Sequence, residues 1–263
     1  MRLVDRYDVV LFDLDGVLFR GDETVPGGPE TLAALRTDGI GLAFVTNNSA
    51  RTPEQVAAKL LGHGYSARPD EVVTSALATA EVLAASGVTE VFVVGEDGIR
   101  QALAGAGIVV LDGEPAAAEC VVIGWDREVT YGKLKTASLL VQRGARLVAT
   151  NADASYPSPD GFWPGAGALL AVITTTTGVE PEVIGKPHAP LFVAARRRVG
   201  GGSPLVVGDR LETDIAGALG IGWDSLLVLS GATSREMAAA SETRPTYVGA
   251  DVRALLLDPV PQE

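Results

Sequence analysis

Hydrophobic residues form short uninterrupted runs along the chain, and several of these runs end abruptly in polar side chains. Such runs cover residues 9–12, 40–45 and 205–207. Runs of this length with no polar face are typical of strands buried on both faces of a parallel sheet. Between them, apolar positions recur with helical spacing over residues 29–37, 53–61 and 76–85. This alternation predicts an α/β fold built on a parallel sheet.

The middle of the chain repeats the same alternation by itself. Strands are predicted over residues 91–94, 108–111, 120–123 and 146–149, with helices over 97–104 and 129–143. A self-contained set of this kind predicts a second α/β domain inserted into the first. Residues 156–167 are rich in Pro and Gly, and they predict a long irregular loop of the kind that often binds a ligand.

Two aspartates end the first apolar run, and open α/β sheets bind their ligands at the carboxyl ends of strands. Asp13 and Asp15 are two residues apart, so they share a face, and Gly16 allows a sharp turn after them. Two converging carboxylates can hold a divalent cation, or one can attack while the other transfers a proton. The Asp-x-Asp pattern alone also fits glycosyltransferases, receiver domains and surface turns.

The next apolar run ends in Thr46 and Asn47, whose hydroxyl and amide groups suit a phosphate. A helix cap is the alternative interpretation. Lys186 lies between Gly and Pro ahead of a predicted helix, where it can reach into a site as a point charge or remain exposed. Asp209 and Asp214 follow the run at 205–207 and can face one cation. No catalytic group is predicted after the strands at 226–229 and 247–248.

Composition narrows the possible functions. A net charge of −12 over 263 residues argues against binding to nucleic acid or to an anionic membrane. Cys120 is the single cysteine and lies in an apolar run, so we expect a buried thiol and no internal disulfide. With His63 and His188 as the only histidines, a zinc site of several His and Cys ligands is excluded. No apolar stretch approaches the roughly 20 residues of a membrane span, and the polar N-terminus does not resemble a signal peptide, so a cytoplasmic location is expected.

Taken together, the strand ends offer four carboxylates, a lysine, a hydroxyl and amides. Four carboxylates cannot all ionise in a dry pocket without a cation, and Lys186 with a divalent metal would offset most of their charge. The hydroxyl and amides would then hold an anion. This set suits phosphoryl transfer, in which positioning and charge neutralisation supply most of the catalysis.

Taken in their order along the chain, these groups resemble the four motifs of the haloacid dehalogenase superfamily. The resemblance is closest to subclass IIA, the branch of p-nitrophenyl phosphatases, phosphoglycolate phosphatases, bacterial glycerol-phosphate phosphatases and a nucleotide phosphatase of the amino-sugar operon. It covers nearly the whole chain and is carried by residues 13–17 (DLDGV), 44–51 (FVTNNSAR), 124–131 (GWDREVTY), 150–153, 165–167, 185–187 and 208–214 (GDRLETD). Val17 stands where many superfamily members have threonine, and valine is common in this branch.

The resemblance implies an architecture and a mechanism. It implies a Rossmann-like parallel-sheet core from residues 1–79 and 184–263, with an inserted α/β cap over 80–183. By the same resemblance, Asp13 is the nucleophile that forms an aspartyl-phosphate, and Asp15 is the general acid and base. Thr46, Asn47 and Lys186 would bind the phosphoryl oxygens. Magnesium would be held by Asp13, the backbone carbonyl of Asp15, Asp209 and Asp214.

The cap would face the leaving group with Asn151, Asp153 and the loop at 156–163. A large cap favours small phosphorylated metabolites, and glycerol phosphate, phosphoglycolate, nucleotide phosphates and sugar phosphates all fit. A homodimer is compatible with the resemblance, because caps in this branch often pair. Three rival interpretations are a receiver domain, a metal-dependent glycosyltransferase and a non-catalytic sensor of phosphometabolites. The inserted domain, Lys186 and the presence of both Asp13 and Asp15 argue against them in turn.

Overall fold

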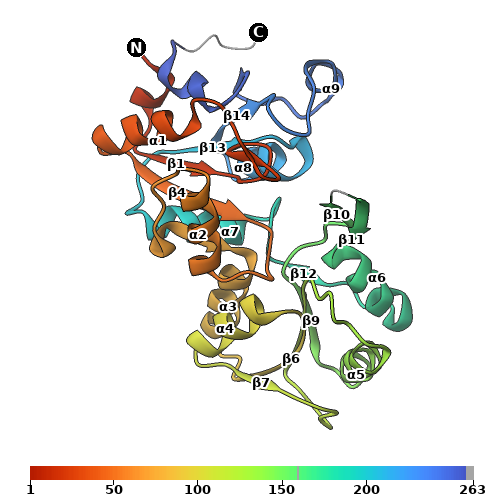
Figure 1. Cartoon of the computed structure of the whole chain (residues 1–263). Helices are drawn as coiled ribbons and strands as arrows, with labels where there is room; N and C mark the ends of the chain where they lie inside the picture. Colours follow the sequence, from red (N-terminus) through yellow and green to blue (C-terminus); the bar gives the residue numbers. More distant parts are fainter. Residues whose placement is uncertain (159, 259–263) are drawn as a thin grey trace. The chain divides into compact units, whose positions relative to one another are not determined.

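The computed structural model describes residues 1–158 and 160–258, and within them the chain forms two compact units (Figure 1). The first unit combines Met1–Thr46, Pro53–Val73 and the chain from Lys186 onward. The second combines Asn47–Thr52 with Thr74–Gly185. The mixed α/β class with parallel sheets, predicted from the apolar runs, is confirmed, and so is the Rossmann-like sheet that the resemblance implied. The roles of the units as catalytic core and cap, with the boundaries given above, remain a prediction.

A six-stranded sheet forms the centre of the first unit, in the order β15-β14-β13-β1-β4-β5. Its strands are β1 (Val9–Phe12), β4 (Gly41–Thr46), β5 (Val72–Thr74), β13 (Pro204–Gly208), β14 (Asp224–Val228) and β15 (Tyr247–Gly249). β1 is fully buried and pairs in parallel with both β13 and β4. The carboxyl ends of these three strands therefore meet at one edge of the sheet.

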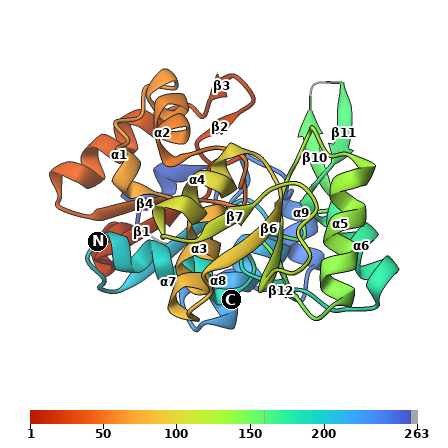
Figure 2. The ribbon, with the colours of Figure 1, turned by 90° about the horizontal axis from the view of Figure 1, so that it is seen from below.

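Helices cover both faces of this sheet. They are α1 (Gly28–Thr37), α2 (Pro53–Gly62), α7 (Ala189–Arg198), α8 (Ala216–Gly220) and α9 (Arg235–Ala240). Leu32 and Leu35 of α1 join Val10 and Phe12 of β1 in the main hydrophobic core. α7 lies on the opposite side of the sheet from α1 (Figure 2). A short hairpin of β2 (Phe19–Arg20) and β3 (Glu23–Thr24) follows β1 directly.

The second unit has its own parallel sheet, in the order β12-β9-β8-β6-β7. The strands are β6 (Glu90–Val94), β7 (Val109–Leu111), β8 (Cys120–Ile123), β9 (Arg146–Ala149) and β12 (Glu182–Val183). Figure 1 shows α3 (Ser75–Ala85) and α4 (Asp97–Gly105) on one side of this sheet, and α5 (Tyr131–Gln142) and α6 (Ala166–Thr177) on the other. Cys120 is fully buried, as its apolar surroundings predicted.

The segment predicted to be an irregular loop at 156–167 is instead ordered as a hairpin, so that prediction was wrong. β10 (Ser155–Ser158) pairs antiparallel with β11 (Gly161–Pro164), and Tyr156 lies opposite Trp163. Aromatic residues favour strands and pair across them, which outweighs the Pro and Gly content here. Pro159, within the predicted loop, lies outside the described residues.

Within residues 1–158 and 160–258, every helix is too short or too polar to cross a membrane.

Candidate active site

The strand ends of the first unit bring three carboxylates together. Asp13 follows β1, Asp209 follows β13, and Asp214 lies in a π-helical turn, Leu211–Ile215, that leads into α8. One carboxylate oxygen from each aspartate lies within 4.8 Å of the others. The side chains of Asp209 and Asp214 are buried, and that of Asp13 is 14% exposed. Two strand ends whose aspartates are 196 residues apart in sequence thus converge on one small acidic cluster.

Lys186 places its ammonium inside this cluster. Its Nζ donates a hydrogen bond to Oδ1 of Asp13 and another, 2.7 Å long, to Oδ1 of Asp214. The lysine side chain is only 5% exposed. Of the two interpretations open for Lys186, a lysine reaching into a site and an exposed lysine, the structure selects the first.

The cluster offers carboxylate oxygens that can bind a cation, and one of these oxygens has no hydrogen-bond partner among the described residues. Oδ2 of Asp209 accepts a hydrogen bond of 2.6 Å from the amide of Ala232, whereas its Oδ1 is buried with no hydrogen-bond partner among the described residues. A buried carboxylate oxygen without a partner is costly. Hard divalent cations such as magnesium prefer carboxylate oxygens. The residues present therefore fit such an ion.

The absence of side chains at two glycines lets the carboxylates approach the backbone. A Cβ on Gly208 would lie 2.1 Å from the Cβ of Asp214. A Cβ on Gly16 would lie 2.2 Å from Oδ2 of Asp209, and Gly16 also has a φ of +83°. Gly16 therefore supplies both the left-handed turn after Asp15 and the room that Asp209 occupies.

Burial dominates the protonation of this cluster. Burial raises the pKa of Asp13 well above its usual range, with Lys186 opposing the shift. Burial, and then the nearby Asp214 carboxylate, raise the pKa of Asp209 to about 6. Burial by itself lowers the pKa of the Lys186 ammonium, but Asp13 and Asp214 outweigh it and raise that pKa. Without a cation, the cluster therefore retains protons that free aspartates would release.

Asp15 is far more exposed than Asp13. Its side chain is 61% exposed, and its Oδ1 lies 3.9 Å from Nζ of Lys59 on α2. That ammonium also lies 3.8 Å from the ring centroid of Phe19, which itself stacks on His63. The aromatic ring thus holds a cation beside the carboxylate of Asp15.

Thr46 and Asn47, which end the apolar run of β4, are divided between the two units. Thr46 is the last residue of β4 and is buried in the first unit, whereas Asn47 belongs to the second. There the side-chain amide of Asn47 donates to Oδ2 of Asp153 at 3.2 Å, and the backbone carbonyl of Asn47 accepts from Nδ2 of Asn151 at 2.8 Å. The structure therefore brings Asn47, Asn151 and Asp153 together within the second unit.

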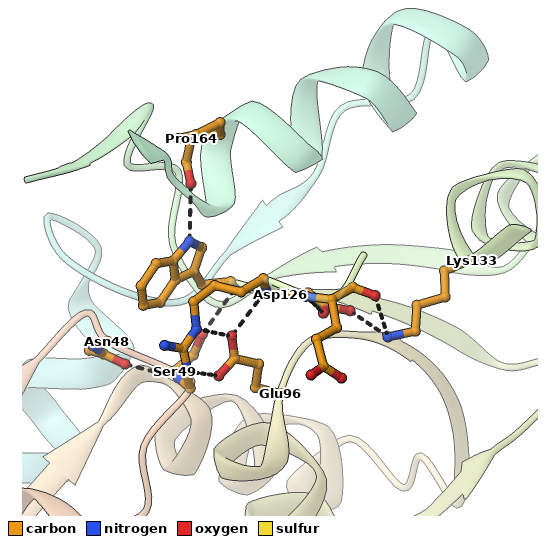
Figure 3. A network of polar contacts seen from close by, with 10 residues as sticks. Asn48, Ser49, Glu96, Asp126, Lys133 and Pro164 are labelled. Carbon is orange, nitrogen blue, oxygen red and sulfur yellow. Dashed lines mark hydrogen bonds and ion pairs between the residues drawn. The ribbon is translucent and has the colours of Figure 1, made fainter. Parts of the chain in front are cut away.

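A polar network explains why Asn47–Thr52 belongs to the second unit (Figure 3). The amide of Trp125 donates to Oγ of Ser49 at 3.4 Å, and the amide of Gly98 donates to the carbonyl of Ala50 at 3.0 Å. Arg127, two residues after Trp125, forms an ion pair of 2.8 Å with Glu96. The GWDREVTY segment singled out in the sequence is thus part of the framework that anchors this loop.

Two contributions to the site were missed by the sequence reasoning. The loop after β14 was expected to carry nothing catalytic, yet its amide at Ala232 holds Asp209. Lys59 was treated only as part of a helix, yet it lies beside Asp15. A main-chain amide leaves no signal in residue type. The small, turn-forming residues Ser230 and Gly231 directly after an apolar run were the available sign.

Comparison with known proteins places the chain among hydrolases. A family profile described as haloacid dehalogenase-like hydrolase matches residues 10–109, and a HAD-hydrolase-like profile matches residues 183–255. An acid sugar phosphatase of Staphylococcus saprophyticus is 39% identical over 95% of this chain and 97% of its own length. The 5'-nucleotidase YutF of Bacillus subtilis is 40% identical over 92% of this chain and 94% of its own.

The structural comparison agrees with the sequence comparison. The crystal structure of a glycerol phosphate phosphatase of Mycobacterium tuberculosis in complex with magnesium has a TM-score of 0.93 and is 36% identical. The match covers 98% of this chain and 79% of that one. Nearly the whole chain thus shares both sequence and fold with these enzymes. The protein belongs to the haloacid dehalogenase-like hydrolase family.

Proposed function

We propose that the protein is a magnesium-dependent phosphatase that hydrolyses small phosphate monoesters through an aspartyl-phosphate on Asp13. The observation that carries the proposal is the buried cluster of Asp13, Asp209 and Asp214 around Lys186, in which one oxygen of Asp209 has no hydrogen-bond partner among the described residues. The names of the relatives, an acid sugar phosphatase, a 5'-nucleotidase and a glycerol phosphate phosphatase, support the reaction class.

The proposed reaction has two steps. A carboxylate oxygen of Asp13 attacks phosphorus, the ester P–O bond breaks, and Asp15 gives a proton to the leaving alkoxide. Asp15 then accepts a proton from a water molecule that attacks the acyl phosphate, which releases inorganic phosphate and restores the Asp13 carboxylate. The exposure of Asp15 supports this role, because both an alkoxide leaving group and a water molecule can reach its carboxylate.

The other core residues bind rather than react. Asp209 and Asp214 would hold magnesium together with the nucleophile Asp13 and the backbone carbonyl of Asp15, and the bound ion would neutralise charge on the transferred phosphoryl group. Lys186, Thr46 and Asn47 are assigned to the phosphoryl oxygens. The ammonium of Lys186 and the hydroxyl of Thr46 can donate hydrogen bonds to such oxygens.

We assign the second unit to substrate selection, as a cap whose Asn151 and Asp153 face the leaving group. The relatives named above act on different small phosphate esters, which supports a specificity set outside the shared motifs. Small phosphorylated metabolites are the substrate class that this assignment favours.

The direct test is phosphate release from a panel of small monoesters, with magnesium or with EDTA. The panel contains glycerol phosphate, phosphoglycolate, a nucleoside monophosphate, a sugar phosphate and p-nitrophenyl phosphate. We expect release that requires magnesium, with one ester clearly preferred. If the folded protein binds magnesium but releases phosphate from none of them, the chain is a phosphometabolite sensor rather than an enzyme.

Magnesium binding should depend on pH, because the cation must displace protons from the cluster. At pH 5.5 Asp209, with its pKa of about 6, is largely protonated, and at pH 8 it is ionised. We therefore expect magnesium to raise Tm more at pH 8 than at pH 5.5, as measured by calorimetry of the same preparation.

In the metal-free protein, the contribution of Asp209 to stability should fall as pH rises. The folded-state pKa of Asp209 lies above the value of about 4 in an unfolded chain, so the folded state binds more protons between the two values. This group therefore contributes stability below about pH 4, and that contribution is lost as pH rises through about 6 in EDTA.

An equal magnesium-induced Tm shift at pH 5.5 and at pH 8 would show that magnesium binding is not coupled to the protonation of Asp209.

A further inference from the structure

The loop that follows β14 contacts the acidic cluster at several points. The amide of Ala232 donates to Oδ2 of Asp209 at 2.6 Å, and the amide of Thr233 donates to the carbonyl of Asp209 at 3.2 Å. The hydroxyl of Ser230 donates to the carbonyl of Gly16 at 2.7 Å. This loop, residues 230–233, therefore ties the end of β13 to the turn that carries Asp13 and Asp15.

The same loop confines the Asp209 carboxylate sterically. A Cβ on Gly231 would lie 2.0 Å from Oδ2 of Asp209, and one on Gly16 would lie 2.2 Å from the same atom. A Cβ on Gly16 would also lie 2.9 Å from the Cα of Gly231. The carboxylate thus lies between two glycine backbones, with room for no larger residue at either position.

These contacts restrain one carboxylate oxygen of Asp209 and do not involve the other. Oδ2 of Asp209 is bonded to an amide and enclosed by glycines, whereas Oδ1 is buried and lacks a hydrogen bond among the described residues. A carboxylate held this way cannot rotate to exchange its oxygens. The oxygen without a partner is then fixed in place, in a carboxylate that has an oxygen within 4.8 Å of an oxygen of Asp13 and of Asp214.

Ser230 is itself placed for this task. Its side chain is buried, its residue being 6% exposed, and its hydrogen bond reaches a carbonyl rather than solvent. Groups that orient metal ligands without touching the metal commonly change metal affinity when they are removed. The hydroxyl of Ser230 links the loop to the Gly16 turn beside Asp209, and the proposed reaction gives Ser230 no other role.

We infer that residues 230–233 form the outer layer of the cation site, in which Ser230 and Gly231 are positioning residues that set magnesium affinity by holding Asp209. The inference rests on the magnesium site of the proposed function but not on the hydrolysis. Ser230 acts through the Gly16 turn, and Gly231 acts by leaving space. Neither touches the cation.

The test is calorimetric titration of metal-free protein with magnesium, without any substrate. We expect Ser230→Ala to raise the Kd for magnesium about 10-fold and Gly231→Ala to raise it about 100-fold, the range found for groups around metal ligands. Ser230→Thr, which keeps the hydroxyl, should recover most of the affinity. Phosphate release by Ser230→Ala should return to the wild-type kcat at saturating magnesium, which a general loss of structure would prevent.

Matched controls come from the same unit. Ser66 is exposed, and a Cβ on Gly220 would have no atom within 4 Å, so Ser66→Ala and Gly220→Ala should bind magnesium within about 2-fold of wild type. Thermal unfolding in EDTA identifies any variant that does not fold. If Gly231→Ala does not fold, the comparison of Ser230→Ala with Ser230→Thr carries the test alone.

The outcomes separate this inference from the proposed function. Wild-type magnesium affinity in folded Ser230→Ala and Gly231→Ala would overturn the inference and leave phosphatase activity intact. A wild-type protein that binds magnesium but hydrolyses nothing would overturn the proposed function, while the predicted losses of affinity would still support the inference. A wild-type protein that binds no magnesium would overturn both.

Discussion

Asp13→Asn is expected to lower kcat for phosphate release by at least about 10⁴-fold, the scale on which removing a nucleophile acts in other hydrolases. An amide oxygen carries no negative charge and cannot form the acyl phosphate. Asparagine has nearly the shape of aspartate, and Lys186 keeps its hydrogen bond to Asp214, so the variant should fold. The measurement is phosphate release at saturating magnesium for the preferred ester of the panel.

Asp22→Asn is the matched control, because it makes the same chemical change at an exposed position of the same unit. We expect it to retain wild-type kcat. A folded Asp13→Asn protein with more than about a tenth of wild-type kcat would exclude Asp13 as nucleophile. Acid-quenched wild-type enzyme should in addition carry phosphate on an aspartate that Asp13→Asn lacks.

Lys186→Met is expected to lower the free energy of unfolding by about 3–5 kcal/mol at pH 7.5 in EDTA, as is typical when one partner of a buried ion pair is removed. Methionine keeps the length of the side chain but removes the ammonium that contacts Asp13 and Asp214. The carboxylates of the cluster would then face one another without that charge. Urea unfolding followed by circular dichroism measures the loss.

Two comparisons isolate the charge effect. Lys135 forms an exposed pair of 2.7 Å with Glu114, so Lys135→Met should cost no more than about 0.5 kcal/mol. The cost of Lys186→Met should also shrink at pH 5, because the raised pKa values of Asp13 and Asp209 let those groups take up protons there. Equal losses for the two lysine variants would show that Lys186 does not compensate buried charge.

The fold and the acidic cluster were predictable because both follow from burial. A strand buried on both faces has no polar residues, so β1, β4 and β13 stand out as apolar runs, and each run ends where polar side chains begin. The carboxyl ends of parallel strands share an edge. That rule alone predicts that Asp13 and Asp209 lie close together, as they do.

The parts that were not predicted depend on contacts between distant residues. The two-residue strands β2 and β3 exist only through their pairing, and β10–β11 hides an aromatic alternation within a Pro- and Gly-rich segment. The ammonium of Lys59 meets Asp15 only because α2 packs where it does. The division of Thr46 and Asn47 between two units likewise has no local sign in the sequence.

That division has a consequence for building chimaeras. A chain designed by exchanging only the long contiguous insert, Thr74–Gly185, would leave Asn47–Thr52 behind with the recipient. The transplanted insert would then lack the native acceptors of Trp125, Gly98 and Asn151, which are Ser49, Ala50 and Asn47. The portable module is therefore discontinuous, and a working graft must carry the six-residue loop together with the insert.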